Sequence, residues 1–264
     1  MARKKGGAIR ARLQFSAVSL ALWSMVAQAQ SVPGNPVVRH GSASFGQQGN
    51  TLLISNSPNS IIDWTAFNIA AGQTTHFSQV NAASRVLNRV SGSMRSEILG
   101  ALTSNGQVIL INPNGITVGP QGRIDTQGFV ASSLALSDAD FLSGKLRFGN
   151  AGQASSGDIV NGGVIQGNGG LVALIGAQVS NSGSIESASG QVALAAGRQV
   201  ELLDAHSPHI RVALNVGDGR DASGQVHRIL QSGRISAAAL PATAGDAAGL
   251  RLDGGRIVLH AQDN

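Results

Sequence analysis

The chain has 264 residues, of which 12% are charged, and its formal net charge is +5. Five of its 19 Lys and Arg residues and none of its 14 Asp and Glu residues lie in residues 1–29, so the rest of the chain carries 19 − 5 = 14 basic and 14 acidic side chains. This balance, without any run of basic residues, excludes a nucleic-acid-binding footprint. The lack of cysteine excludes a disulfide-stapled scaffold.

Residues 1–29 are predicted to be a secretory signal peptide. A basic front precedes an apolar stretch from Leu13 to Ala27, and Ala27 and Ala29 place small residues at the two cleavage positions, before Gln30. A membrane anchor is the alternative, but this stretch is interrupted by polar residues and is shorter than the roughly 20 apolar residues that span a bilayer. About 235 residues remain, enough for one large domain.

The first part of the exported chain is expected to cap a stacked sheet. The open end of such a sheet invites pairing with other chains, so it needs a cover. Residues 30–80 contain two strand-like pieces, Thr51 to Ile54 and Ile61 to Phe67. Trp64 and Phe67 are interpreted as core of this N-terminal β cap in preference to a ligand platform.

Two later stretches suggest helix. Apolar residues recur every four positions in residues 84–99, which would suit a helix, although Gly92 in the middle argues against it. Residues 137–141 are expected to form one short helical turn with a Ser or Asp cap, ended by Gly144. The Ala- and Gly-rich residues 236–250 are expected to form a loop outside the main fold.

Internal repeats carry the strongest prediction of the fold. Residues 161–180 and 181–200 are identical at seven positions when shifted by 20. Each unit contains two short alternating apolar runs introduced by glycine, and alternation places one face of a strand inward. A Gly-x-Val/Ile-x-Leu run recurs as Gly106-Val108-Leu110, Gly170-Val172-Leu174, Gly190-Val192-Leu194 and Gly255-Ile257-Leu259.

A period near 20 with two or three strands per unit predicts a right-handed parallel β-helix, a solenoid with small extra-helical hairpins. A sandwich or barrel is the alternative, but neither requires equivalent positions to recur at a fixed shift. Equivalent polar residues such as Asn161 and Asn181 should stack in a ladder. The remaining length predicts about ten coils, given a strand spacing of about 4.8 Å. The chain stops at Asn264 just after such a run, which suggests the first part of a longer protein.

The motif Ile111-Asn112-Pro113-Asn114-Gly115-Ile116 links two apolar runs. Pro113 fixes φ for a tight turn, and Gly115 can adopt positive φ. The two Asn side chains can bond nearby backbone groups. The motif is therefore interpreted as a turn at a coil corner.

Six segments in order resemble the N-terminal secretion domain of filamentous-haemagglutinin-type exoproteins, the passenger proteins of two-partner secretion systems. The resemblance covers residues 35–150, with a β-helix behind it. A second motif of that family, Asn-Pro-Asn-Leu, is missing. The segments are SNSPNSIIDWTAFNI (55–69), LNRVSG (87–92), ILGAL (98–102), NGQVILINPNGI (105–116), GFVASSLAL (128–136) and SDADFLSGKLRF (137–148).

The resemblance implies a route and a partner. Such proteins reach the periplasm, are recognised by an outer-membrane barrel transporter with periplasmic domains, and fold outside a Gram-negative cell, secreted or on its surface. It also implies that Asn112, Pro113, Asn114, Gly115 and Ile116 form the transporter-recognition or folding motif. The domain boundaries implied are a secretion domain over 30–150 and continuing repeats over 151–264.

The resemblance favours an adhesin or haemagglutinin that contacts host cells or other bacteria. Delivery of a haemolysin or contact-dependent toxin is the alternative, and a polysaccharide-active β-helix enzyme is remote. Catalysis is not expected, because acidic residues are scattered. No cofactor is expected, and a solvated loop is favoured over a metal site for the densest polar cluster. The scattered residues are Asp125, Asp158, Glu186, Glu201, Asp204 and Asp218, and the cluster contains Glu201, Asp204, His206 and His209.

Overall fold

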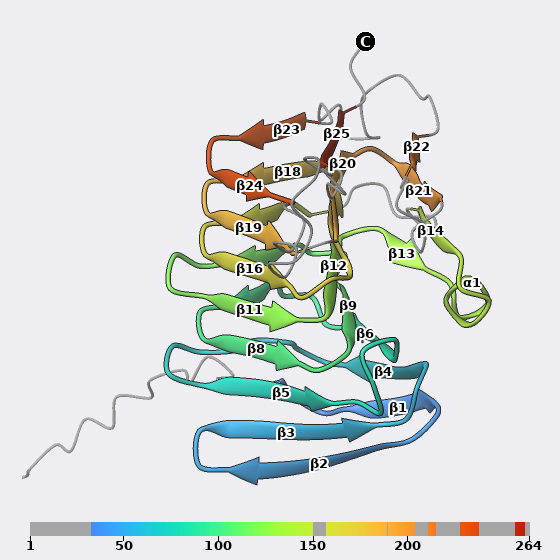
Figure 1. Ribbon diagram of the computed structural model, residues 1–264. Helices are drawn as coiled ribbons and strands as arrows, with labels where there is room; N and C mark the ends of the chain where they lie inside the picture. The colour runs from blue at the N-terminus through green and yellow to red at the C-terminus, as the bar shows by residue number, and fades with distance from the viewer. Residues whose placement is uncertain are drawn as a thin grey trace, which may run out of the picture.

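The protein is described by a computed structural model that covers residues 33–149, 157–188, 190–203, 211–214, 228–237 and 257–261. Its strands stack into a right-handed parallel β-solenoid, with an extra layer on one side (Figure 1). The predicted signal peptide lies outside the described residues. So does the predicted loop over 236–250, except for Ser236, which ends a strand, and Ala237. In the described part of the chain, no helix is long and apolar enough to cross a bilayer.

Three stacked sheets form the walls of the solenoid. Sheet I contains β2 (Ala43–Gln48), β3 (Thr51–Asn56), β5 (Thr74–Ser78), β8 (Ala101–Ser104), β11 (Arg123–Thr126), β16 (Val164–Gly167), β19 (Ser184–Ser187) and β24 (Arg234–Ser236). Sheet II contains β1 (Val37–His40), β4 (Ser60–Trp64), β6 (Arg85–Val90), β9 (Gln107–Ile111), β12 (Gly128–Ser132), β17 (Leu171–Gly176), β20 (Gln191–Ala196) and β25 (Ile257–Ala261). Sheet III contains β7 (Ser96–Ile98), β10 (Ile116–Val118), β15 (Ile159–Asn161), β18 (Gln178–Asn181) and β23 (Arg228–Gln231).

The register of these sheets confirms the 20-residue repeat predicted from the sequence. Val172 and Leu174 in β17 lie directly over Val192 and Leu194 in β20, the predicted shift of 20 residues. Val108 in β9 is in the same column, two strands away from Val172 through Phe129. The pairing between successive turns is parallel throughout, so the sandwich alternative is excluded.

The solenoid has about six turns, and the prediction of about ten was wrong. Within the described residues, the difference arises because the chain leaves the coil between β12 and β15 and again between β20 and β23. The described parts of these excursions are β13 (Ala135–Leu136), α1 (Asp138–Leu142), β14 (Leu146–Gly149), β21 (Gln199–Leu203) and β22 (Arg211–Leu214). The four strands form one antiparallel sheet, which together with α1 is called the outer layer.

The outer layer explains why sheet II is more apolar than alternation requires. All described positions of β12 and β17 are buried, because one face packs into the solenoid core and the other against the outer layer. A strand buried on both faces reads as a continuous apolar run, as in Leu-Val-Ala-Leu-Ile of β17. The predicted alternation therefore holds for sheets I and III but not for this part of sheet II.

The N-terminal cap is shorter than predicted. Within the three solenoid sheets, the antiparallel pairs are β1 with β4 and β2 with β3, and β1 and β2 cover the first turn (Figure 1). β3, β4 and β5 already pair in parallel with the next strand along, so they belong to the coil. Trp64 and Phe67 are core residues, each 1% exposed. The Trp64 ring meets the rings of both Phe67 and Phe45 edge to face.

Of the two segments expected to be helical, only residues 137–141 contain a helix. Residues 84–99 form β6 and β7, so the helical reading was wrong. A spacing of four also keeps residues on one face of a strand, and Asn88 fills the inward position between Val86 and Val90. The short helix is confirmed as α1: the Ser137 side chain accepts a hydrogen bond from the Asp140 backbone N–H, and Gly144 follows with φ +77°.

Candidate functional site

The Asn-Pro-Asn-Gly motif forms the corner between β9 in sheet II and β10 in sheet III. The backbone N–H of Gly115 donates to the Asn112 carbonyl at 2.9 Å, which closes a four-residue turn. Asn at the first position, Pro at the second and Gly at the fourth are the preferences of a type I turn. The turn predicted from the sequence therefore lies where it was expected, at a coil corner.

Asn112 is fully buried and fully hydrogen-bonded. Its side-chain NH2 group donates to the Met94 carbonyl and to Ser96 Oγ, both at 3.0 Å. Its Oδ1 accepts from the Asn114 backbone N–H at 2.9 Å and from the Asn114 side chain at 3.2 Å. The amide therefore joins its own turn to the corner of the preceding turn, and a buried amide satisfied in this way holds one geometry.

The same corner is also attached to the following turn. Asn114 donates to the Gly92 carbonyl of the preceding turn at 2.8 Å. On the other side, the Gly157 N–H donates to the Pro113 carbonyl at 2.7 Å and the Ile116 N–H to the Asp158 carbonyl at 3.1 Å. The motif thus connects three successive turns of the solenoid.

Gly115 is required at this corner on two grounds. Its φ is +102°, a conformation that side chains with a Cβ disfavour. A Cβ there would also lie 2.7 Å from the Asp158 carbonyl oxygen. Ile116, the last residue of the motif, is fully buried and begins β10 in the core.

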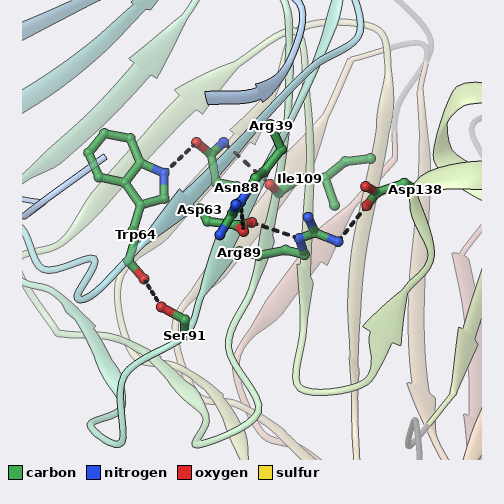
Figure 2. A network of polar contacts seen from close by, with 8 residues as sticks. All are labelled: Arg39, Asp63, Trp64, Asn88, Arg89, Ser91, Ile109 and Asp138. Carbon is green, nitrogen blue, oxygen red and sulfur yellow. Dashed lines mark hydrogen bonds and ion pairs between the residues drawn. The ribbon is translucent and has the colours of Figure 1, made fainter. Parts of the chain in front are cut away.

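A second polar cluster, near the cap, was not found from the sequence. The Trp64 indole Nε1 donates to Asn88 Oδ1 at 3.0 Å inside the core (Figure 2). The Asn88 side chain in turn donates to the Ile109 carbonyl at 3.4 Å. A lone Asn between valines in a strand was the available signal, because an inward position in such a run is normally apolar.

Figure 2 also shows a chain of charges on the outer face of sheet II. Asp63 accepts from Arg39 of β1 at 2.7 Å and from Arg89 of β6 at 2.9 Å. Arg89 continues to Asp138 of α1 at 2.5 Å. These contacts tie the cap, the first two turns and the outer layer together.

The residues considered for catalysis or metal binding do not come together where they are described. Asp125 accepts from Arg123 at 3.1 Å and from Asn168 at 2.8 Å, Glu186 from Ser184 at 3.3 Å, and Glu201 from Arg147 at 2.6 Å. Asp158 contributes its carbonyl to the motif. Asp204, His206, His209 and Asp218 lie outside the described residues. Within the described ranges, no group of three or more acidic or His side chains is placed to hold a metal ion.

Comparison with known proteins assigns the family. The TPS secretion domain family matches residues 28–264. The chain belongs to this family of two-partner secretion domains. The structure resembles the crystal structure of the HMW1 secretion domain from Haemophilus influenzae, with a TM-score of 0.70 and 32% identity, over 86% of this chain and 62% of that one.

Two curated relatives of the TPS domain agree with this assignment. Both are heme/hemopexin-binding proteins of Haemophilus influenzae. One is 36% identical over 108 residues, which are 40% of this chain and 12% of the relative. The other is 39% identical over 72 residues, 27% of this chain and 8% of the relative. The matched part of the TPS domain thus spans only a small fraction of these relatives, and the chain is the secretion domain of a two-partner secretion exoprotein.

Proposed function

We propose that this TPS domain is recognised by an outer-membrane transporter with periplasmic domains and is exported through it to the cell surface or medium of a Gram-negative bacterium. In this proposal the chain reaches the periplasm by its signal peptide, unfolded, and forms the solenoid outside. The family assignment is the observation that carries the proposal. The lack of cysteine is compatible with it, because no disulfide can trap the chain before export.

Within this proposal, the Asn112–Ile116 motif acts in folding outside the cell. The buried amide of Asn112 uses all its hydrogen-bonding groups inside the solenoid. A transporter that read these groups in the folded chain would have to break those contacts. In the unfolded chain the same groups are free, so early binding to the transporter remains compatible with later use in the corner.

For the complete exoprotein we propose a non-catalytic binding role, as an adhesin or haemagglutinin. The names of the curated relatives favour a second candidate, capture of heme or a heme-carrying protein. Delivery of a haemolysin or toxin is a further alternative. These roles would be distinguished by expressing the full-length exoprotein and measuring cell adhesion, heme binding and lysis.

The export proposal is tested by expressing the chain with and without a transporter of this class in the same strain. Signal-cleaved, protease-resistant protein should appear in the medium only with the transporter. A transporter lacking its periplasmic domains is the matched control and should leave the chain in the cell. Equal amounts in the medium in all three strains would contradict the proposal.

A further inference from the structure

The outer layer is assembled from two excursions that are far apart in sequence. Both leave the solenoid at the corner between sheets II and III. β14 from the first pairs antiparallel with β21 from the second, with Leu146 opposite Leu202 and Phe148 opposite Val200. Six strands, β15 to β20, lie between them in the chain. The layer is therefore completed only when two further turns of the solenoid are in place.

The first excursion contacts β6, a strand that precedes it in the chain, so these contacts do not require the second excursion. Asp138 of α1 pairs with Arg89, and the Arg85 guanidinium lies 5.6 Å from the ring centroid of Phe141. Both arginines belong to β6, which precedes the excursion in the chain. Burial against α1 lowers the pKa of Arg85, in keeping with a guanidinium covered by this contact. The helix end of the excursion can thus dock on turns already formed.

β14 itself lacks a complete partner until β21 arrives. Its neighbour on the other side, β13, pairs with only two of its four residues, whereas β21 pairs with all four. The inward side chains of both strands are buried against the outer face of sheet II. On the outward side, Arg147 and Glu201 form an ion pair of 2.6 Å across 54 residues of sequence.

We propose that β21 is a locking strand: by adding to β14 it closes the outer layer over sheet II and makes the first excursion resistant to opening. Before this step, β14 presents an unpaired edge, and Leu146 and Phe148 lack the cover of Val200 and Leu202. Such non-local pairing forms late, because the loop between the strands must be ordered first. The shortest chain that folds completely should therefore extend beyond Leu203.

Trypsin provides a direct readout of the lock. Lys145 and Arg147 flank Leu146 at the start of β14, so cleavage there requires local opening of the strand. In purified chain without residues 1–29, Leu202→Asp should raise the cleavage rate at these two sites about tenfold or more, because proteolysis follows the population of the open form. Leu203→Asp is the matched control: this neighbour is half-buried, points the other way and lies opposite Arg211.

Fluorescence of Trp64 separates opening of the lock from global unfolding, because the other tryptophan, Trp23, lies in the predicted signal peptide. Faster cleavage at Lys145 and Arg147 with unchanged Trp64 emission supports the lock. Equal cleavage rates in Leu202→Asp and Leu203→Asp, at unchanged emission, would overturn it.

A second variant keeps the proposal testable if Leu202→Asp fails to fold. The chain has no cysteine, so Arg147→Cys with Glu201→Cys introduces one possible disulfide between directly opposed residues. The oxidised form should be cleaved more slowly at Lys145 than the reduced form. A control pair in sheet III, Thr117→Cys with Val160→Cys, should not slow that cleavage. A disulfide that forms between 147 and 201 without protecting Lys145 would overturn the lock.

These measurements use purified chain, refolded from urea where export fails, and need no transporter. Their outcome is therefore independent of the export experiment.

Discussion

Trp64 and Asn88, on neighbouring turns of the solenoid, are joined by a 3.0 Å hydrogen bond from the indole Nε1 to the amide Oδ1 in the core. Both side chains are at most 1% exposed, so water cannot replace either partner. The main cost of losing this bond to folding stability is that the buried Trp64 N–H would be left without an acceptor.

We therefore predict that Asn88→Ala lowers the free energy of unfolding by about 1–3 kcal/mol, the cost of a buried unpaired polar group. Urea unfolding followed by Trp64 fluorescence would measure it. Asn50→Ala is the control, because Asn50 lies in an exposed turn and its side chain donates a long hydrogen bond of 3.3 Å to the Gly72 carbonyl. The control should change stability by less than about 0.5 kcal/mol. Equal effects of the two variants would contradict this account.

Successive turns approach each other closely along a column of glycines at the corner between sheets III and I, so a larger residue should not fit there. A Cβ on Gly183 would lie 2.1 Å from the Gly163 carbonyl oxygen, and one on Gly163 would lie 2.3 Å from that of Gly122. Gly183→Ala should therefore force successive turns apart and destabilise the fold by about 1–3 kcal/mol, as overpacking does. Gly46→Ala in β2, where a Cβ would meet nothing within 4 Å, is the control. The urea midpoints of the two variants should differ clearly.

The repeats in the sequence predict the coil well where successive turns use the same residues. In the turn that contains β12, Phe129 and Ala131 occupy the columns that Val172 and Leu174 occupy in β17. Phe129 is larger than Val172 and Ala131 is smaller than Leu174, so the two turns fill similar core space with different residues. A search for identical residues therefore misses this turn. Small extra-helical hairpins were expected outside the coil, and the outer layer confirms them. The pairing of β14 with β21 could not be predicted, because the two strands occur once each and their pairing depends on three-dimensional proximity.

The sequence predicts the turn at Asn112–Ile116 but not its contacts with the neighbouring turns. The turn itself follows from the local preferences of Asn112, Pro113 and Gly115. The partners of Asn112, the Met94 carbonyl and Ser96 Oγ, lie 18 and 16 residues earlier. Those contacts depend on the register between turns, and in this N-terminal part the chain does not repeat regularly enough to show it.

Replacement of Asn112 should weaken both folding and export. Asn112→Ala removes four hydrogen bonds and leaves the Asn114 N–H without its acceptor, so we expect a loss of about 2–3 kcal/mol in unfolding free energy. Less protein should reach the medium than with Asn168→Ala, an exposed corner control. Normal stability with reduced export would instead assign the motif to recognition by the transporter.

Gly115→Val should reduce secretion as well, through backbone strain. Valine disfavours φ of +102°, and its Cβ would approach the Asp158 carbonyl oxygen at 2.7 Å. Quantitative immunoblotting of the medium and the cell fraction would test this expectation. Secretion at the level of the unmodified chain would show that the corner tolerates a displaced turn.

The charge chain through Asp63 should make the cap sensitive to salt. Asp63→Asn removes the partner that Arg39 and Arg89 share, and Asp63 is only 19% exposed. We expect a loss of about 1 kcal/mol at low ionic strength, where partly screened ion pairs contribute most. The difference from the unmodified chain should shrink in 1 M salt, where the Debye length is about 3 Å. Glu186→Gln should show little of this dependence, because the amide oxygen of Gln can still accept the hydrogen bond from Ser184.

The predicted ladder of Asn161 and Asn181 is confirmed and extends by one step. Asn161 donates to Asn181 Oδ1 at 2.7 Å, and Asn181 donates to Gln231 Oε1 at 2.9 Å. Asn181, in the middle of the ladder, thus accepts from the preceding turn and donates to the following one. Asn181 is fully buried, so a group that can only accept at this position would face the Gln231 oxygen without a proton between them.

Asn181→Asp should therefore introduce a pH-dependent weakness. Burial favours the neutral carboxylic acid, which raises the pKa of the new Asp in the folded chain above its unfolded value of about 3.9. The protonated form can donate to Gln231, so the variant should be close to normal in stability below about pH 4 and lose stability as the pH rises through the folded pKa. Asn50→Asp, in an exposed turn where the side chain contacts the neutral Gly72 carbonyl at 3.3 Å, should show no comparable loss. A stability difference from the unmodified chain that is the same at pH 4 and pH 7 would mean that the ladder tolerates an ionised carboxylate, and that its amides are not required as donors.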